Sequence, residues 1–170
     1  MGILGNLFKS KKDPLRENAA TLVAAAIINA TGMYMPFLRK FPSLGEAAVN
    51  MKQWGFILTV AGVFIAATRL NSLQLGDARG ESLMQTVCES LAEWDSDGLR
   101  GFDDCKGMFE SEYDRLNAAG HEPRFISSDA LGLWIVWNVL GRAPETKEEF
   151  LLVRTTGGMV TDAFFDWWKV

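Results

Sequence analysis

The acidic stretch from Glu93 to Asp104 comes closest in this sequence to the residue types and spacing of a metal site. Aligned on Gly98 as the turn glycine, four carboxylates fall at positions one, three, five and twelve of a calcium-binding EF-hand loop: Glu93, Asp95, Asp97 and Asp104. The match fails at position one, which is usually Asp, at position twelve, which is usually Glu, and at position eight, where Arg100 replaces an apolar residue. We interpret the stretch as an Asp-Gly turn between two helices, with a cation-binding loop as the alternative.

The other residues that carry chemistry lack partners in the sequence. His121 is the only histidine, so the chain supplies neither the paired Glu-x-x-His motifs of a di-iron bundle nor an HExxH zinc motif. Cys88 and Cys105 lack the paired spacing of a zinc site, and Cys88 lies on the apolar flank of a predicted helix, where burial makes a thiol inert. The sequence therefore predicts a non-enzyme with no catalytic residue, no cofactor and no metal ligand.

A central apolar helix is predicted from Ser43 to about Leu75. Ser43 and Glu46 form a capping-box pattern at its start, and no charged residue occurs from Trp54 to Thr68. A helix that is apolar on every face is either the centre of a bundle or a membrane segment. The uncharged run spans roughly 22 Å as a helix, less than the ~30 Å hydrocarbon core of a bilayer. We therefore predict a buried bundle helix.

Five further helical segments are predicted around the central one. They run from residue 14 to about 30 or beyond, from about 81 to 94, from about 102 to 119, from a cap at Ser127, Ser128 or Asp129 to Gly141, and from the Thr146–Glu149 capping box onward. We expect Gly157-Gly158 to interrupt or kink the last one. The run from Leu133 to Val139 is alternatively a buried strand.

Small residues recur at steps of four, three and four in the first two predicted helices. They are Ala19, Val23, Ala26 and Ala30 in the first, and Gly55, Thr59, Gly62 and Ala66 in the second. Each set lies on one stripe of its helix, and two such stripes predict a close antiparallel pair. The segments together predict an all-α, single-domain bundle of five to seven helices in residues 17–170, preceded by an N-terminal arm in residues 1–16.

The N-terminal arm has the pattern of a short basic amphipathic segment. Apolar residues that can share one helical face precede three lysines: Ile3, Leu4, Leu7 and Phe8, then Lys9, Lys11 and Lys12. Segments of this kind can lie on an anionic membrane surface. Asn6 stands where the N-myristoylation pattern needs Ser or Thr, so that modification is not expected. The alternative is an arm that docks on the fold or frays.

Aromatic residues fill four of five positions near the C-terminus: Phe164, Phe165, Trp167 and Trp168. Adjacent residues on a helix point about 100° apart, so a helix packed on one side cannot bury all four. Large aromatic side chains are common anchors of protein interfaces. We therefore predict that these residues bind a partner. The alternative is that residues Met1 to Phe8 cover them within the monomer.

Composition narrows the function classes. The net charge of −4 and the pI near 5.1 give no electrostatic footprint for nucleic acid. We predict a non-enzymatic helical interaction or assembly protein that acts through packed and aromatic surfaces, with a second copy or another protein as its partner. Free cysteines indicate a reducing compartment, hence the cytoplasm or the inner face of a membrane. The alternatives are a membrane-peripheral protein held by its basic N-terminus and a bundle with an apolar small-ligand pocket.

Overall fold

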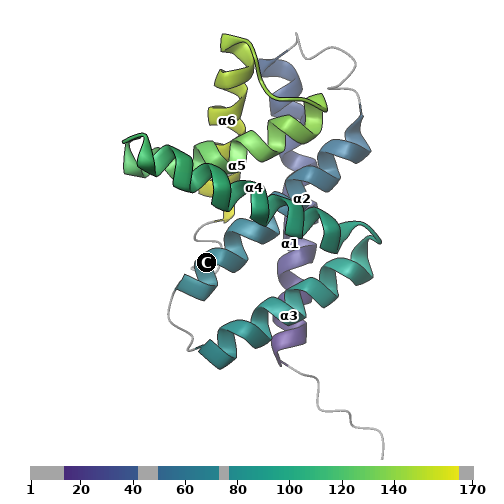
Figure 1. Cartoon of the computed structure of the whole chain (residues 1–170). Coiled ribbons are helices and arrows are strands. Elements are labelled where there is room, and N and C mark those ends of the chain that lie inside the picture. The colour runs from purple at the N-terminus through teal and green to yellow at the C-terminus, as the bar shows by residue number, and fades with distance from the viewer. Residues whose placement is uncertain (1–13, 42–49, 73–76, 165–170) are drawn as a thin grey trace, which may run out of the picture.

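The computed structural model describes residues 14–41, 50–72 and 77–164 (Figure 1). These residues form six helices: α1 (Pro14–Lys40), α2 (Met51–Ser72), α3 (Asp77–Trp94), α4 (Gly98–Ala118), α5 (Pro123–Leu140) and α6 (Lys147–Phe164). No strand occurs in the described ranges, so the prediction of an all-α bundle is confirmed. The strand alternative for Leu133 to Val139 is wrong, because that run lies inside α5.

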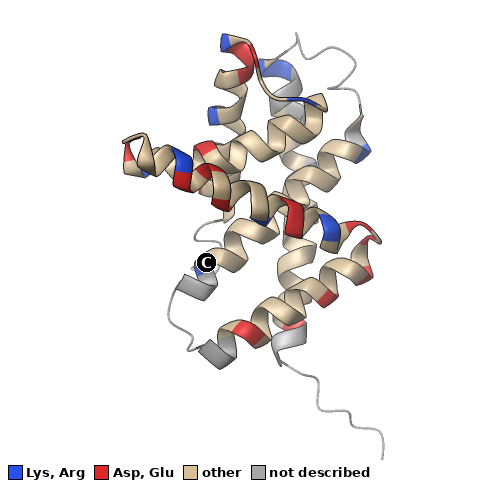
Figure 2. Cartoon of the chain, in the orientation of Figure 1, with Lys and Arg blue, Asp and Glu red and all other residues tan. Residues whose placement is uncertain are grey.

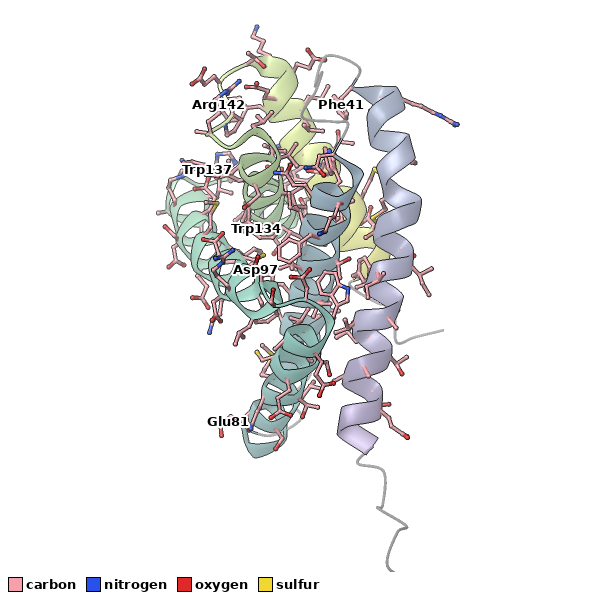
Figure 3. The ribbon with its side chains drawn as sticks, turned by 90° about the vertical axis from the view of Figure 1, so that its right-hand side faces the viewer. Phe41, Glu81, Asp97, Trp134, Trp137 and Arg142 are labelled. Carbon is pink, nitrogen blue, oxygen red and sulfur yellow. The ribbon has the colours of Figure 1, made fainter. Side chains whose placement is uncertain are left out.

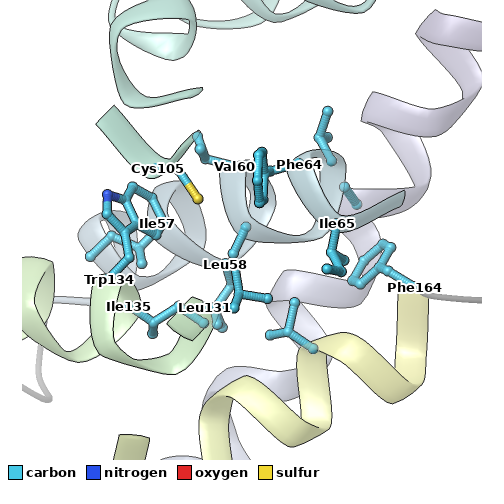
Figure 4. Close-up of a cluster of buried hydrophobic side chains, with 14 of the residues drawn as sticks. Ile57, Leu58, Val60, Phe64, Ile65, Cys105, Leu131, Trp134, Ile135 and Phe164 are labelled. Carbon is cyan, nitrogen blue, oxygen red and sulfur yellow. The ribbon is translucent and has the colours of Figure 1, made fainter. Parts of the chain in front are cut away.

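The central position of α2 explains why its sequence carries no charge over so long a run. Each of the other five described helices contacts α2, and all residues from Ile57 to Ala67 are buried. An unpaired charge at any of these positions would lose its hydration without compensation. Figure 2 shows Lys, Arg, Asp and Glu on the outer helices, with α2 almost free of them between its first and last turns. Figure 4 shows part of the core, in which side chains of α2, α4, α5 and α6 meet.

Helix α1 packs along α2 and runs in the opposite direction, as the small-residue stripes predict (Figures 1 and 3). The stripe of α1 is buried in full: Ala19, Val23, Ala26 and Ala30. A Cβ atom on Gly62 would lie 2.7 Å from a ring carbon of Phe164 in α6, and Gly55 borders a hollow instead of a close contact. In the described part of the chain, no helix is long and apolar enough to cross a bilayer.

Several helix boundaries follow the capping signals of the sequence. Gly141 ends α5 with a φ of 68°, in the left-handed region that glycine adopts most readily. Before α6, the Glu149 amide donates to Thr146 Oγ1 at 3.2 Å and the Thr146 amide donates to Glu149 Oε2 at 3.0 Å, so the predicted capping box is confirmed. The capping box predicted at Ser43 and Glu46 lies outside the described residues.

Three helices begin earlier than predicted, and one of them is α3, which begins at Asp77 and not near residue 81. Helix α5 begins at Pro123, because a proline in the first turn lacks only an N–H that would have no helical partner. The caps predicted at Ser127 to Asp129 therefore lie inside the helix. Helix α4 begins at Gly98 and not near Phe102.

Helices α5 and α6 cross through two glycines. A Cβ atom on Gly132 would lie 1.9 Å from the Val153 carbonyl oxygen, and one on Gly157 would lie 1.8 Å from the Ser128 carbonyl oxygen. The two main chains are therefore in direct contact. Helix α6 continues without a break through Gly157-Gly158, so the predicted interruption is wrong. The glycine at 157 makes room for α5.

Candidate interaction surface

The acidic stretch between α3 and α4 is a short turn and not a cation-binding loop. Helix α3 ends at Trp94 and α4 begins at Gly98, so the last residues of the expected twelve-residue loop are helical. The Asp97 amide donates to Asp95 Oδ1 at 2.9 Å, and Asp104 accepts a hydrogen bond from Trp134 Nε1 at 2.8 Å. The EF-hand alternative is therefore wrong. Among the described residues, no group of three or more His, Cys, Asp or Glu side chains could hold a metal ion.

The histidine and the thiols are not arranged as catalytic groups. His121 is exposed in the turn between α4 and α5, where its amide donates to the Leu116 carbonyl oxygen at 3.0 Å. Burial, and secondly the charge of Asp103, raises the pKa of Cys88. Burial raises the pKa of Cys105 well above its ordinary value. A raised pKa keeps both side chains as neutral thiols, which are weak nucleophiles and poor metal ligands.

Of the four aromatic residues near the C-terminus, the structure describes Phe164. Phe164 is 1 % exposed, and its ring packs on Gly62 in the core of the monomer (Figure 4). Phe165, Trp167 and Trp168 lie outside the described residues, so their predicted contact with a partner stays a prediction. The same holds for the predicted membrane-surface residues of the arm: Ile3, Leu4, Leu7, Phe8, Lys9, Lys11 and Lys12.

Exposed apolar side chains of the described chain point to a different surface. Phe150 and Leu151, adjacent in the first turns of α6, are 55 % and 54 % exposed. They border a hollow of about 380 Å³ between α4, α5 and α6. Its apolar lining is Leu116, Leu133, Phe150, Leu151 and Val153, and its polar lining is Glu112, Arg115, His121, Asp129 and Arg154. We call these residues the α4–α6 surface.

A tryptophan extends the apolar character of α5 beside this surface. Trp137 lies one turn after Leu133, so both project from the same face of α5. Trp137 is 40 % exposed, whereas Trp134 is 1 % exposed and bonded to α4 (both labelled in Figure 3). Monomeric proteins scatter exposed apolar residues singly, whereas adjacent ones framed by polar residues are typical of interaction sites.

Ion pairs frame the hollow. Arg154 forms two hydrogen bonds to Asp129, Nε to Oδ1 at 3.2 Å and Nη2 to Oδ2 at 2.7 Å. Arg115 likewise donates to both carboxylate oxygens of Glu112. The Arg154 guanidinium also lies 5.0 Å from the ring centroid of Phe125, close enough for a cation–π contact. Each arginine of the rim is therefore paired with its own carboxylate.

A third ion pair lies at the turn that leads into α6. Arg142 Nη2 donates to Glu149 Oε1 at 2.6 Å. This bond, together with the Glu145 and Thr146 amides, lowers the pKa of Glu149 to about 2. Glu149 therefore stays ionised at neutral pH and holds the start of α6, from which Phe150 and Leu151 project.

The sequence gives no signal for the α4–α6 surface. Phe150 and Leu151 have the spacing of ordinary helix residues, and the face of α6 that stays outside depends on its packing against both α5 and α2. The surface offers apolar contact and fixed charges, without a nucleophile and base in hydrogen-bond contact.

Comparison with models of known protein families, with curated proteins and with solved structures finds no match to this chain. The class of protein is therefore inferred from its own residues and their geometry.

Proposed function

We propose that the protein is a non-enzymatic assembly protein that self-associates through the α4–α6 surface. The observation that carries the proposal is the exposure of Phe150 and Leu151 side by side at the edge of an apolar hollow. Interfaces are enriched in aromatic side chains and arginine near their centre, with polar residues around them. The α4–α6 surface has this composition.

The energetic argument concerns the apolar side chains. Burying a Leu or Phe side chain that was exposed gains about 1.5–3 kcal/mol. Because Phe150 and Leu151 are each about half exposed in the monomer, only part of that gain is left for association. A two-fold interface uses the same patch on each subunit. In a dimer formed through this surface, Phe150 and Leu151 of both copies would therefore become buried.

The charges of the rim favour a second copy as the partner. The chain carries a net charge of −4, so two copies repel each other on average. The α4–α6 surface pairs Arg115 with Glu112 and Arg154 with Asp129, so it carries no excess of either sign at these pairs. Identical copies can therefore approach at this face without like-charge repulsion. A strongly basic or acidic partner would find no complementary field there.

Size-exclusion chromatography with light scattering tests the proposal. We expect the purified chain to elute at a multiple of its 18.8 kDa mass, in an equilibrium that shifts with concentration. Replacing both exposed residues, Phe150→Asp and Leu151→Asp, should yield monomer at the same concentration. A wild-type chain that stays monomeric, or an oligomer that survives the double substitution, would contradict self-association through this surface.

Binding of a small apolar ligand is the second candidate, supported by a hollow of about 620 Å³ near the start of α2. Its lining includes Phe56 and Trp94, whose rings stack with centroids 5.7 Å apart, and Gly55, where a Cβ atom would meet nothing within 4 Å. Charged residues complete the lining, namely Lys52, Asp95, Asp97 and Arg100, so a ligand with a polar end fits this hollow. This volume lies in the ~300–1,000 Å³ range of ligand pockets. Anilinonaphthalene sulfonate should bind the wild type and lose that binding in Gly55→Leu, which fills the hollow. Equal dye binding by both proteins would remove this candidate.

A further inference from the structure

The hollow near the start of α2 carries aromatic, acidic and basic side chains on different elements. Its lining comes mainly from the first turns of α2 and from the end of α3 with the turn that follows. We propose that this hollow binds a small aromatic zwitterion, which combines a flat ring, an ammonium group and a carboxylate, as an aromatic amino acid does. The inference rests on the second candidate function, that the hollow takes a small ligand, and adds the chemical class of that ligand.

The ring of such a ligand has an aromatic wall to lie against. Phe56 of α2 and Trp94 at the end of α3 stack with an angle of 16° between their planes, and both side chains are half-buried. Both residues also line the hollow, so part of the stack faces it. Aromatic rings that meet in offset or edge-to-face contact gain attraction beyond the burial of their area. The wall therefore favours a flat ring over an aliphatic chain.

A buried hydroxyl group gives the hollow a polar floor. Thr59 is 1 % exposed and lines the hollow, and its hydroxyl forms no hydrogen bond with the described residues. A buried hydroxyl without a partner costs free energy. A polar atom of a bound ligand would remove that cost, which a purely apolar ligand would leave in place.

Two charged groups of the lining form no ion pair among the described residues, and their signs are opposite. Lys52 lies in the first turn of α2, where the positive end of the helix dipole also favours an anion. Asp95 accepts the Asp97 amide at 2.9 Å through Oδ1, which leaves its Oδ2 open. The other two charges of the lining form their own pair, with Arg100 Nη2 3.1 Å from Asp97 Oδ1. A zwitterion therefore matches both open charges, whereas an ion of one sign leaves one of them unmatched.

Four probes that share an indole ring separate ring binding from charge recognition. They are indole itself, tryptamine, which adds an ammonium group, indole-3-propionate, which adds a carboxylate, and tryptophan, which carries both. Isothermal titration calorimetry with the full chain measures the dissociation constant of each probe. We expect tryptophan to bind at least ~threefold more tightly than tryptamine or indole-3-propionate, because it gains one additional charge pair near the surface.

Two substitutions assign each charge of the ligand to its partner. Lys52→Gln should weaken the binding of tryptophan and indole-3-propionate about three- to fivefold and leave tryptamine unchanged. Asp95→Asn should weaken tryptophan and tryptamine by a similar factor and leave indole-3-propionate unchanged. The asparagine keeps the oxygen that accepts the Asp97 amide, so the turn is preserved. The matched controls are Lys147→Gln and Asp103→Asn, which remove the same charges at exposed positions outside the hollow.

Three results would overturn the inference, and they separate it from the candidate function on which it rests. If tryptophan binds no more tightly than indole, and Gly55→Leu abolishes the binding of both, the hollow takes an apolar ligand and ignores charge. If the two control substitutions weaken tryptophan as much as Lys52→Gln and Asp95→Asn do, its charges are not recognised in this hollow. If none of the four probes binds, the inference and the second candidate function both fail. Self-association is tested separately, because this hollow shares no lining residue with the α4–α6 surface.

Discussion

A Cβ atom on Gly157 would lie 1.8 Å from the backbone carbonyl oxygen of Ser128, so α5 and α6 touch through their main chains at this point. The contact sets the distance and the rotation between the two helices. Phe150 lies two turns before Gly157 and therefore on the same side of α6, yet its side chain is 55 % exposed. The crossing thus fixes the position of the helix that carries Phe150 and Leu151.

The first prediction concerns this crossing. Gly157→Ala should lower the free energy of unfolding by at least ~2 kcal/mol, because the new methyl group would overlap the Ser128 carbonyl oxygen, which belongs to the backbone of α5 and cannot move aside. Urea denaturation measures the effect. The matched control is Gly158→Ala, where the new Cβ atom meets nothing within 4 Å. That substitution should stabilise the chain by up to about 1 kcal/mol through helix propensity. Equal effects of the two substitutions would mean that the helices do not cross as described.

The second prediction tests whether Phe164 belongs to the monomer core. Gly62→Ala should destabilise the fold by about 1–3 kcal/mol, since the new Cβ atom would lie 2.7 Å from the Phe164 ring. Gly55→Ala on the same helix, with open space around its Cβ position, is the control and should be neutral or stabilising. In a Phe164→Leu background the penalty of Gly62→Ala should shrink. A penalty of unchanged size would place the Phe164 ring elsewhere.

The third prediction concerns the bond between α4 and α5. Trp134 is buried, and its Nε1 donates to Asp104 Oδ2 at 2.8 Å. Asp104→Ala leaves that donor without its acceptor and should lower the free energy of unfolding by about 1–3 kcal/mol. Asp104→Asn keeps an acceptor oxygen and should lose much less. The neighbouring substitution Asp103→Ala, at an exposed position on the same helix, should be close to neutral by the same denaturation measurement.

The fourth prediction is a pH dependence. The pKa of Glu149 is lowered to about 2 from an ordinary value of 4.5, so the folded state binds its proton less readily than the unfolded state does. Its contribution to stability is therefore fully present above pH 4.5 and is lost as the pH falls from 4.5 toward 2. Glu149→Gln removes this titration and should flatten the stability–pH curve across that window. A curve of unchanged slope would mean that the bond to Arg142 is not maintained in solution.

The sequence predicts the helices of this fold better than it predicts their contacts. The uncharged run from Trp54 to Thr68 correctly identifies α2 as central, because a helix without a polar face must be buried on all sides. Thr146 and Glu149 predict the start of α6 because capping is a local interaction. The start of α5 is predicted too late, because the hydroxyl residues at 127 and 128 resemble caps although Pro123 already allows the helix to begin.

Contacts between helices depend on geometry that no local pattern records. Gly157 has the local appearance of a helix breaker, and its role in the close crossing becomes apparent only when Ser128 of α5 lies against it. Phe150 and Leu151 are 55 % and 54 % exposed although Phe150 shares a helix face with Gly157, so periodicity alone does not distinguish them from core residues. In the sequence, Phe164 belongs to a cluster of aromatic residues that is typical of interfaces. In the structure, its ring fills the space that Gly62 leaves.

The most direct test of self-association compares two single substitutions of the same kind. Leu151→Asp and Leu99→Asp each replace a leucine that is about half exposed, at 54 % and 40 %, and add the same charge. Sedimentation equilibrium of both variants and the wild type gives the monomer–dimer dissociation constant. We predict that Leu151→Asp weakens association at least tenfold, equivalent to about 1.4 kcal/mol, while Leu99→Asp leaves it unchanged. A purely monomeric wild type, or equal weakening by both substitutions, would contradict assembly through the α4–α6 surface.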